Sequence, residues 1–146
     1  MSDLMAINEA DSLSLLENEL QSLYNVHAAL EAEAKALAEG DAPALEVALG
    51  LKEAAIGTYQ SQRSLRTQAP ACQDTDQTRS MLTELQNAAE ACVSRNKSNG
   101  SLAFRLTEAT QAALNILRGT ESTGQLYSYA GMERASHTSS RSLGRA

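Results

Sequence analysis

The chain has 146 residues, of which 42% are hydrophobic and only 3% aromatic, with no tryptophan and two prolines. This length is enough for one domain with its own core, and a composition so poor in aromatic residues is typical of a helical bundle rather than a β-fold. The formal net charge of -6 at pH 7 argues against a nucleic-acid-binding protein, which needs clustered lysine and arginine.

The start of the chain and its cysteines indicate where the protein works. Residues 1–5 have no basic region and no long apolar run, so we do not expect a signal peptide. No segment approaches the roughly 20 apolar residues of a membrane span. Cys72 and Cys92 lack the close spacing of a zinc site and are predicted to be free thiols, with Cys72 on the surface and Cys92 buried. We therefore predict a cytoplasmic, all-α protein without metal or other cofactor.

A first helix is predicted to begin between Asn8 and Ser14, where Ser14 and Glu17 have the spacing of a capping box. Its apolar residues repeat every seven positions, and charged residues lie outside them, so the helix should pack along a long partner. The apolar face comprises Leu13, Leu16, Leu20, Leu23, His27, Leu30, Ala34 and Leu37, and the residues outside it are Glu17, Glu19, Glu31, Glu33 and Lys35.

His27 is the polar member of this face, and three roles are open to it. A metal ligand would need a second histidine or a Glu-x-x-His pair, which the sequence lacks. A phosphate acceptor would need an exposed histidine within a pattern of basic or small residues, and Val26 and residues 28–30 do not form such a pattern. We predict a partly buried structural residue, with a His27 phosphotransfer bundle as an alternative.

A second helix is predicted from Ala42 to about Gln68, antiparallel to the first. Gly40 is expected as a left-handed C-cap, followed by an N-cap at Asp41 and an early proline at Pro43. Lys52 should pack its stem and place its ammonium near the acidic first helix. The predicted apolar face comprises Leu45, Leu49, Lys52, Ile56, Tyr59 and Arg63, with Leu51 and Leu65 beside it.

A third helix is predicted over Gln77–Arg118, after Pro70 and a polar linker, and before a C-cap at Gly119. Asn99-Gly100 would normally indicate a turn, but the stripe of apolar and small residues keeps its phase across this pair. We therefore predict one continuous helix. The stripe comprises Leu85, Ala89, Cys92, Asn96, Asn99, Ala103, Leu106, Thr110, Ala113 and Leu117.

The expected helix lengths indicate a binding surface. The first two helices should span about 28 residues or roughly 42 Å each, and the third about 42 residues or roughly 63 Å. Beyond Phe104 the third helix should therefore project past the turn at Gly40 and expose an apolar face, which would accept an amphipathic helix. A homodimer through this face is the alternative. The residues expected there are Leu106, Ala109, Ala113, Leu114, Ile116 and Leu117.

The predicted domain boundaries are a helical bundle over residues 1–118 and a flexible tail over residues 119–146, which is rich in Ser, Thr, Gly and Arg. The tail holds one apolar patch, Leu126-Tyr127-Ser128-Tyr129, followed by Gly131. Two of the four tyrosines of the chain lie in it. We predict a short recognition motif, and docking of the patch on the bundle is the alternative.

These features resemble the FlgN-like flagellar type III export chaperones over nearly the whole chain. Members of that family are small acidic helical proteins with a leucine-striped first helix. Two motifs carry the likeness: Asn96-x-x-Asn99-Gly100-x-Leu102 in the third helix, and Leu126-Tyr127-Ser128-x-x-Gly131 in the tail. Ser128 stands where the family tends to have glycine.

The resemblance implies a chaperone that makes and breaks no bonds and is therefore not an enzyme. It would cover the C-terminal helical segment of the hook-filament junction proteins FlgK and FlgL, prevent their premature assembly and escort them to the cytoplasmic domain of the export-gate protein FlhA. The groove between the second and third helices and the exposed end of the third would hold the client, and Tyr127 would contact the gate. The client-binding residues would be Asn96, Asn99, Leu102, Leu106, Ala109, Ala113, Leu114 and Leu117, and the gate-docking residues Leu126, Tyr127 and Gly131. The alternatives from other classes are a homodimeric structural coiled coil and the His27 phosphotransfer bundle.

Overall fold

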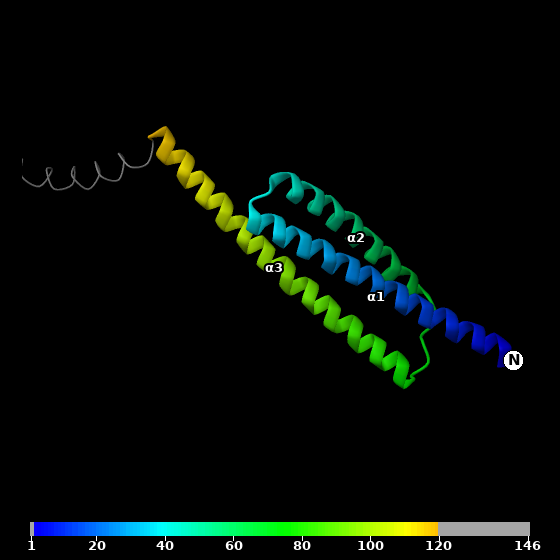
Figure 1. Cartoon of the computed structure of the whole chain (residues 1–146). Helices are drawn as coiled ribbons and strands as arrows, with labels where there is room; N and C mark the ends of the chain where they lie inside the picture. Colours follow the sequence, from blue (N-terminus) through cyan, green and yellow to red (C-terminus); the bar gives the residue numbers. More distant parts are fainter. Residues whose placement is uncertain (1, 120–146) are drawn as a thin grey trace, which may run out of the picture. The chain divides into compact units, whose positions relative to one another are not determined.

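The structure, a computed structural model, describes residues 2–119, with side chains from residue 10 onward. This part of the chain forms three helices and no strand: α1 (Ser2–Glu39), α2 (Ala42–Gln68) and α3 (Asp76–Arg118). The all-α prediction is thereby confirmed, with an antiparallel hairpin followed by a long third helix (Figure 1).

The predicted start of the first helix is wrong, because α1 begins at Ser2 and has 38 residues. Ser12, in the region where we expected the helix to begin, is instead a buried residue within the helix. A polar residue acts as an N-cap only where the backbone before it is not helical. No proline or glycine precedes Ser12 to interrupt the helix there, so α1 continues back to Ser2. The first helix is therefore longer than the 28 residues used in the length argument, whereas α2, with 27 residues, and α3, with 43, are close to expectation.

The helix connections follow the predicted capping residues. Gly40 has a φ of 67°, the left-handed conformation that favours glycine after a helix. The Asp41 side chain accepts a hydrogen bond from the backbone N–H of Ala44 at 3.0 Å, and Pro43 lies in the first turn of α2. Before α3, the Thr75 hydroxyl accepts a hydrogen bond from the N–H of Thr78 at 3.1 Å. Gly119, with a φ of 69°, follows the end of α3 as predicted.

α1 supplies most of the core of residues 1–103 and packs against both other helices (Figure 1). Partly buried side chains from α2, from the linker and from the first half of α3 complete this core. Its buried members are Leu16, Leu20, Leu23, Val26 and Leu30 of α1 and Leu85 and Cys92 of α3.

The buried face of α2 is rotated from the predicted one. Ala48 is its one fully buried residue, whereas Leu49, Leu51 and Leu65 are exposed. Ala55 and Tyr59 pack against the core cluster. Small residues let two helices approach closely, so burial on α2 follows the alanines rather than the largest apolar side chains.

Two acidic residues that were placed outside the core of α1 are buried. The Glu19 side chain is 1% exposed and forms an ion pair with Arg66 of α2. The Glu33 side chain is 8% exposed and pairs with Lys52 of α2, with 2.8 Å between Lys52 Nζ and Glu33 Oε1. The prediction for Lys52 is confirmed. Glu19 and Glu33, which we placed outside the apolar heptad positions, are nevertheless buried, because cationic partners from α2 compensate for the loss of water.

α3 is continuous through Asn99-Gly100, as predicted. The chain nevertheless divides into two compact units, residues 1–103 and residues 104–146, and the boundary falls within this helix. We therefore describe the two units separately.

Candidate functional site

An open groove lies between α2 and α3 in the first unit, with a volume of about 430 Å³. Its lining combines core leucines with residues from both flanking helices, and Ile56 and Val93 are exposed apolar residues along it. Apolar atoms dominate such a surface, so it is suited to an apolar side chain or helix face rather than to a charged ligand. The lining residues are Leu23, Val26 and Leu30 of α1, Ile56, Tyr59, Gln60 and Arg63 of α2, and Ala89, Cys92, Val93 and Asn96 of α3.

The predicted client residues of the first unit occupy different environments. Asn96 is exposed and lines the groove. Asn99 is only 3% exposed, and its amide nitrogen donates hydrogen bonds to the carbonyl of Leu30 and to Glu33 Oε2, both at 2.9 Å. Leu102 is half-buried. The two asparagines of the motif are therefore not equivalent, because one faces the groove and the other is used inside the bundle.

The second unit contains the last fifteen residues of α3, and its apolar side chains are exposed. Leu106 is 41% exposed and Leu117 is 83% exposed. Ala109 and Ala113 lie on the same helical face, because these positions recur at steps of three and four. Other exposed large apolar residues here are Phe104, Leu114 and Ile116. Leu114 and Ile116 were predicted to lie on the exposed face, although only Leu114 was among the client-binding residues, whereas Phe104 was in neither set.

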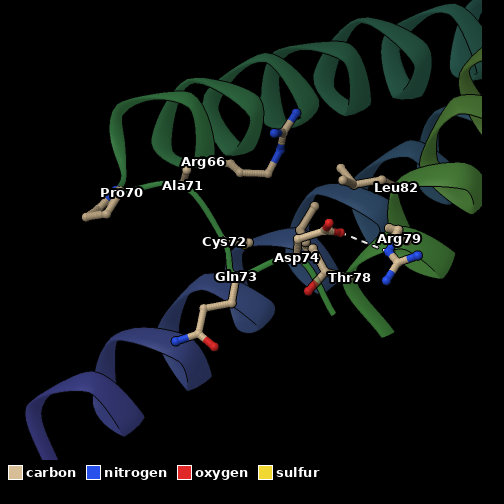
Figure 2. A pocket seen from close by; sticks show the side chains of 10 residues that line it. Arg66, Pro70, Ala71, Cys72, Gln73, Asp74, Thr78, Arg79 and Leu82 are labelled. Atoms are coloured by element: carbon tan, nitrogen blue, oxygen red, sulfur yellow. Dashed lines mark ion pairs between the residues drawn. The ribbon is translucent and has the colours of Figure 1, made fainter. Parts of the chain in front are cut away.

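A second cavity, of about 300 Å³, lies where the α2–α3 linker passes over α1 (Figure 2). Its charged residues are already paired. Arg66 is bonded to Glu19, and Arg79 Nε lies 2.9 Å from Asp74 Oδ1, the pair that Figure 2 marks with a dashed line. We interpret this cavity as a structural junction, because no charged group that lines it is left to bind a ligand.

Cys72 and Cys92 are both free thiols, as predicted. Cys72 is partly exposed and lines the cavity beside the α2–α3 linker. Cys92 is buried, and its Sγ donates a hydrogen bond to the Leu23 carbonyl at 3.6 Å. Burial raises the pKa of the Cys92 thiol, because the thiolate loses its hydration. Cys92 therefore behaves as a small core residue.

His27 is half exposed on α1, and its Nε2 lies 3.7 Å from Glu31 Oε1 on the next turn. This agrees with a partly buried structural residue. Glu31 is also bonded to Arg95 of α3, and these hydrogen bonds lower the pKa of its carboxyl group. Within residues 2–119 there is no cluster of three or more histidine, cysteine, aspartate or glutamate residues that could hold a metal ion.

The predicted gate-docking site and the predicted absence of a membrane span differ in how far the described residues bear on them. Leu126, Tyr127 and Gly131, the proposed gate-docking residues, lie outside them, as does nearly all of the predicted tail. No helix within the described part of the chain is both long and apolar enough to span a membrane.

A helical bundle with an open apolar groove and a separate stretch of exposed apolar helix defines an all-α protein suited to binding other helices. The family model "FlgN protein" matches residues 5–135, which is most of the chain. The chain therefore belongs to the FlgN family, and it is a flagellar export chaperone in the general sense that this family defines. Searches of curated proteins and of solved structures gave no significant match.

Proposed function

We propose that this protein is a cytoplasmic chaperone for the hook-filament junction proteins FlgK and FlgL. It binds their C-terminal helical segments through the exposed apolar face of residues 104–118, prevents premature assembly and delivers the clients to the cytoplasmic domain of FlhA. The family match supports the chaperone class, and the exposed face of α3 supports this site.

The single observation that carries the client site is the concentration of exposed large apolar residues in residues 104–118. Five of them, Phe104, Leu106, Leu114, Ile116 and Leu117, are exposed within four helical turns. At 3.6 residues per turn, Leu106, Ile116 and Leu117 share one side of the helix with Ala109 and Ala113, Leu114 lies at the edge of this group, and Phe104 lies on the opposite side. Single exposed apolar residues are ordinary, but a group on one side of a helix is typical of an interaction surface. An amphipathic client helix could bury this group with its own apolar positions.

The same surface accounts for reversible binding. Burying an apolar patch of about 300–600 Å² contributes roughly 8–15 kcal/mol at about 25 cal/mol per Å². Association and the ordering of a flexible client segment cost a large part of this, so the net affinity should be moderate. A carrier that must release its client at the export gate needs such an affinity.

Calorimetric titration with a C-terminal peptide of FlgK or FlgL tests the site. Leu106→Asp and Leu117→Asp should each weaken peptide binding at least tenfold, because each places a carboxylate in a surface that must lose its water. Leu65→Asp is the matched control, since Leu65 is an exposed leucine of α2 that lines neither the α2–α3 groove nor the cavity beside the α2–α3 linker. It should bind the peptide like the wild type, and circular dichroism should show equal helicity for all three variants.

Other results would indicate a different client site or a different function. If Val93→Asp weakens binding and the two α3 variants do not, the client lies in the α2–α3 groove instead. If the client peptide does not bind at all, and Leu117→Asp converts a dimer into a monomer in sedimentation experiments, the homodimeric coiled coil replaces the chaperone. Unchanged binding in both Leu106→Asp and Leu117→Asp would reject the site.

A further inference from the structure

α1 and α3 meet in a parallel arrangement with a fixed register. Cys92 donates to the carbonyl of Leu23, and Asn99 donates to the carbonyl of Leu30. Both contacts join residues that are 69 positions apart in the chain, and they lie one heptad apart on each helix. The same offset relates Leu16 to Leu85, and both of these residues belong to the buried core.

The apolar pattern alone does not determine this register. Leucine recurs every seven residues along α1, at positions 16, 23, 30 and 37, and the row of α3 that faces it within the first unit consists of residues 85, 92 and 99, with Leu106 at the next heptad position of the sequence. A shift of α3 by one heptad, about 10 Å along the axis, would again place apolar residues opposite apolar residues at most levels. Something other than the hydrophobic pattern must favour the observed register.

The hydrogen bonds of Asn99 distinguish the observed register from the shifted ones. Besides its bond to the Leu30 carbonyl, it donates to Glu33 Oε2 at 2.9 Å, while Lys52 holds Glu33 Oε1 at 2.8 Å. The buried carboxylate of Glu33 is therefore satisfied by one group from α2 and one from α3. A shift of one heptad would bring either Cys92 or Leu106 opposite Leu30 and Glu33, and neither has an amide to replace that of Asn99.

We propose that Asn99 is a positioning residue that fixes the register of α3 on α1 through the carboxylate of Glu33. It thereby determines which residues of α3 enter the bundle core and which stay available outside it. Its effect on client binding rests on the proposed function, whereas its effect on register does not. A single asparagine at a heptad core position can select register in this way, at some cost in stability.

Register can be measured by electron spin resonance between two nitroxide labels. We would place them at the exposed positions Ala38 of α1 and Asn87 of α3, as A38C and N87C, after replacing the native thiols by C72S and C92A. At the observed offset these positions are separated by about 30 Å along the helix axis, so a shift of one heptad changes this separation to about 20 or about 40 Å. Either direction of shift is therefore visible.

Removal of the Asn99 amide should produce a second population in the distance distribution. Asn99→Leu replaces the amide by an apolar side chain, and Asn99→Ala does so with the best helix-forming residue, so that helicity is retained. Asn96→Leu is the matched control, because Asn96 is an exposed asparagine one turn away. Glu33→Gln keeps an acceptor for Asn99. Both of these should keep the single wild-type distance.

The outcomes separate this proposal from the proposed function. A single wild-type distance in both Asn99→Leu and Asn99→Ala, with helicity intact, would overturn the positioning role, whatever happens to client binding, because the register would then be kept without the Asn99 amide. A second distance in the Asn99 variants, absent from the Asn96 control, supports the positioning role. If that second distance appears while client binding is unchanged, the positioning role stands, because it does not depend on the proposed function.

Discussion

The buried pair of Glu19 and Arg66 offers the sharpest test of how the hairpin is held together. Arg66→Met keeps much of the packing volume of the arginine stem and removes its charge, which leaves the Glu19 carboxylate buried without its cation. Breaking a fully buried ion pair from one side costs about 3–5 kcal/mol. Because the Arg66 side chain is 27% exposed, solvent screens part of this, and we expect the lower end, about 3 kcal/mol.

Urea unfolding followed by circular dichroism measures this loss. With a slope of about 1.5–3 kcal/mol per M, the midpoint should fall by about 1–2 M while the slope stays the same. Arg79→Met is the matched control, because Arg79 pairs with Asp74 on the surface, where both side chains are largely exposed. It should shift the midpoint very little.

A double variant completes the test. Glu19→Leu with Arg66→Met replaces the buried pair by apolar side chains and should recover most of the lost stability, because no unpaired charge remains. If Arg66→Met is no more destabilising than Arg79→Met, the burial of Glu19 does not have the energetic role that we assign to it.

Three further predictions concern reactivity, pH and the tail. Cys92 should react with iodoacetamide far more slowly than Cys72 in the native protein and equally fast in urea, because it is buried and its thiol pKa is raised; equal native rates by mass spectrometry would contradict its place in the core. The hydrogen bonds from Arg95 lower the pKa of the Glu31 carboxyl group in the folded protein. The ion pair of Glu31 and Arg95 therefore stabilises the fold fully above the ordinary carboxyl pKa of about 4.3, and this stabilisation is lost as the pH falls through the lowered pKa of Glu31. The difference in urea midpoint between wild type and Arg95→Met should thus shrink between about pH 6 and about pH 3, and a constant difference would count against the pair. Tyr127→Ala should spare client binding and weaken association with the FlhA cytoplasmic domain in a pull-down with both purified proteins, whereas equal loss of both would remove the proposed division of labour.

Local signals in the sequence were sufficient for the connections and for the long helix. Gly40 and Asp41 act through their own backbone and the next turn, so their roles can be predicted without knowledge of the fold. The continuity of α3 through Gly100 followed from the phase of its apolar stripe, because one glycine costs a helix only about 1 kcal/mol.

The features that the sequence did not reveal depend on partners far away in the chain. Glu19 resembles a solvated residue of an acidic helix until Arg66, 47 residues later, is placed beside it. The buried face of α2 was predicted incorrectly for a related reason. The prediction followed the large apolar residues, whereas the close approach of α1 favours the burial of a small residue, Ala48. The role of Asn99 also depends on Glu33, 66 residues away, so its motif alone did not distinguish a client contact from a bond within the bundle.

The central claim is that the client lies against the exposed apolar face of residues 104–118, and site-specific photo-crosslinking tests it most directly. A benzophenone amino acid would replace Leu117, or Leu65 as the control, in the full chain mixed with purified FlgK or FlgL. We predict an efficient crosslink from position 117 that maps to the C-terminal helical segment of the client, and little or none from position 65. Equal crosslinking from both positions, or none from position 117 under conditions in which the complex forms, would contradict the claim.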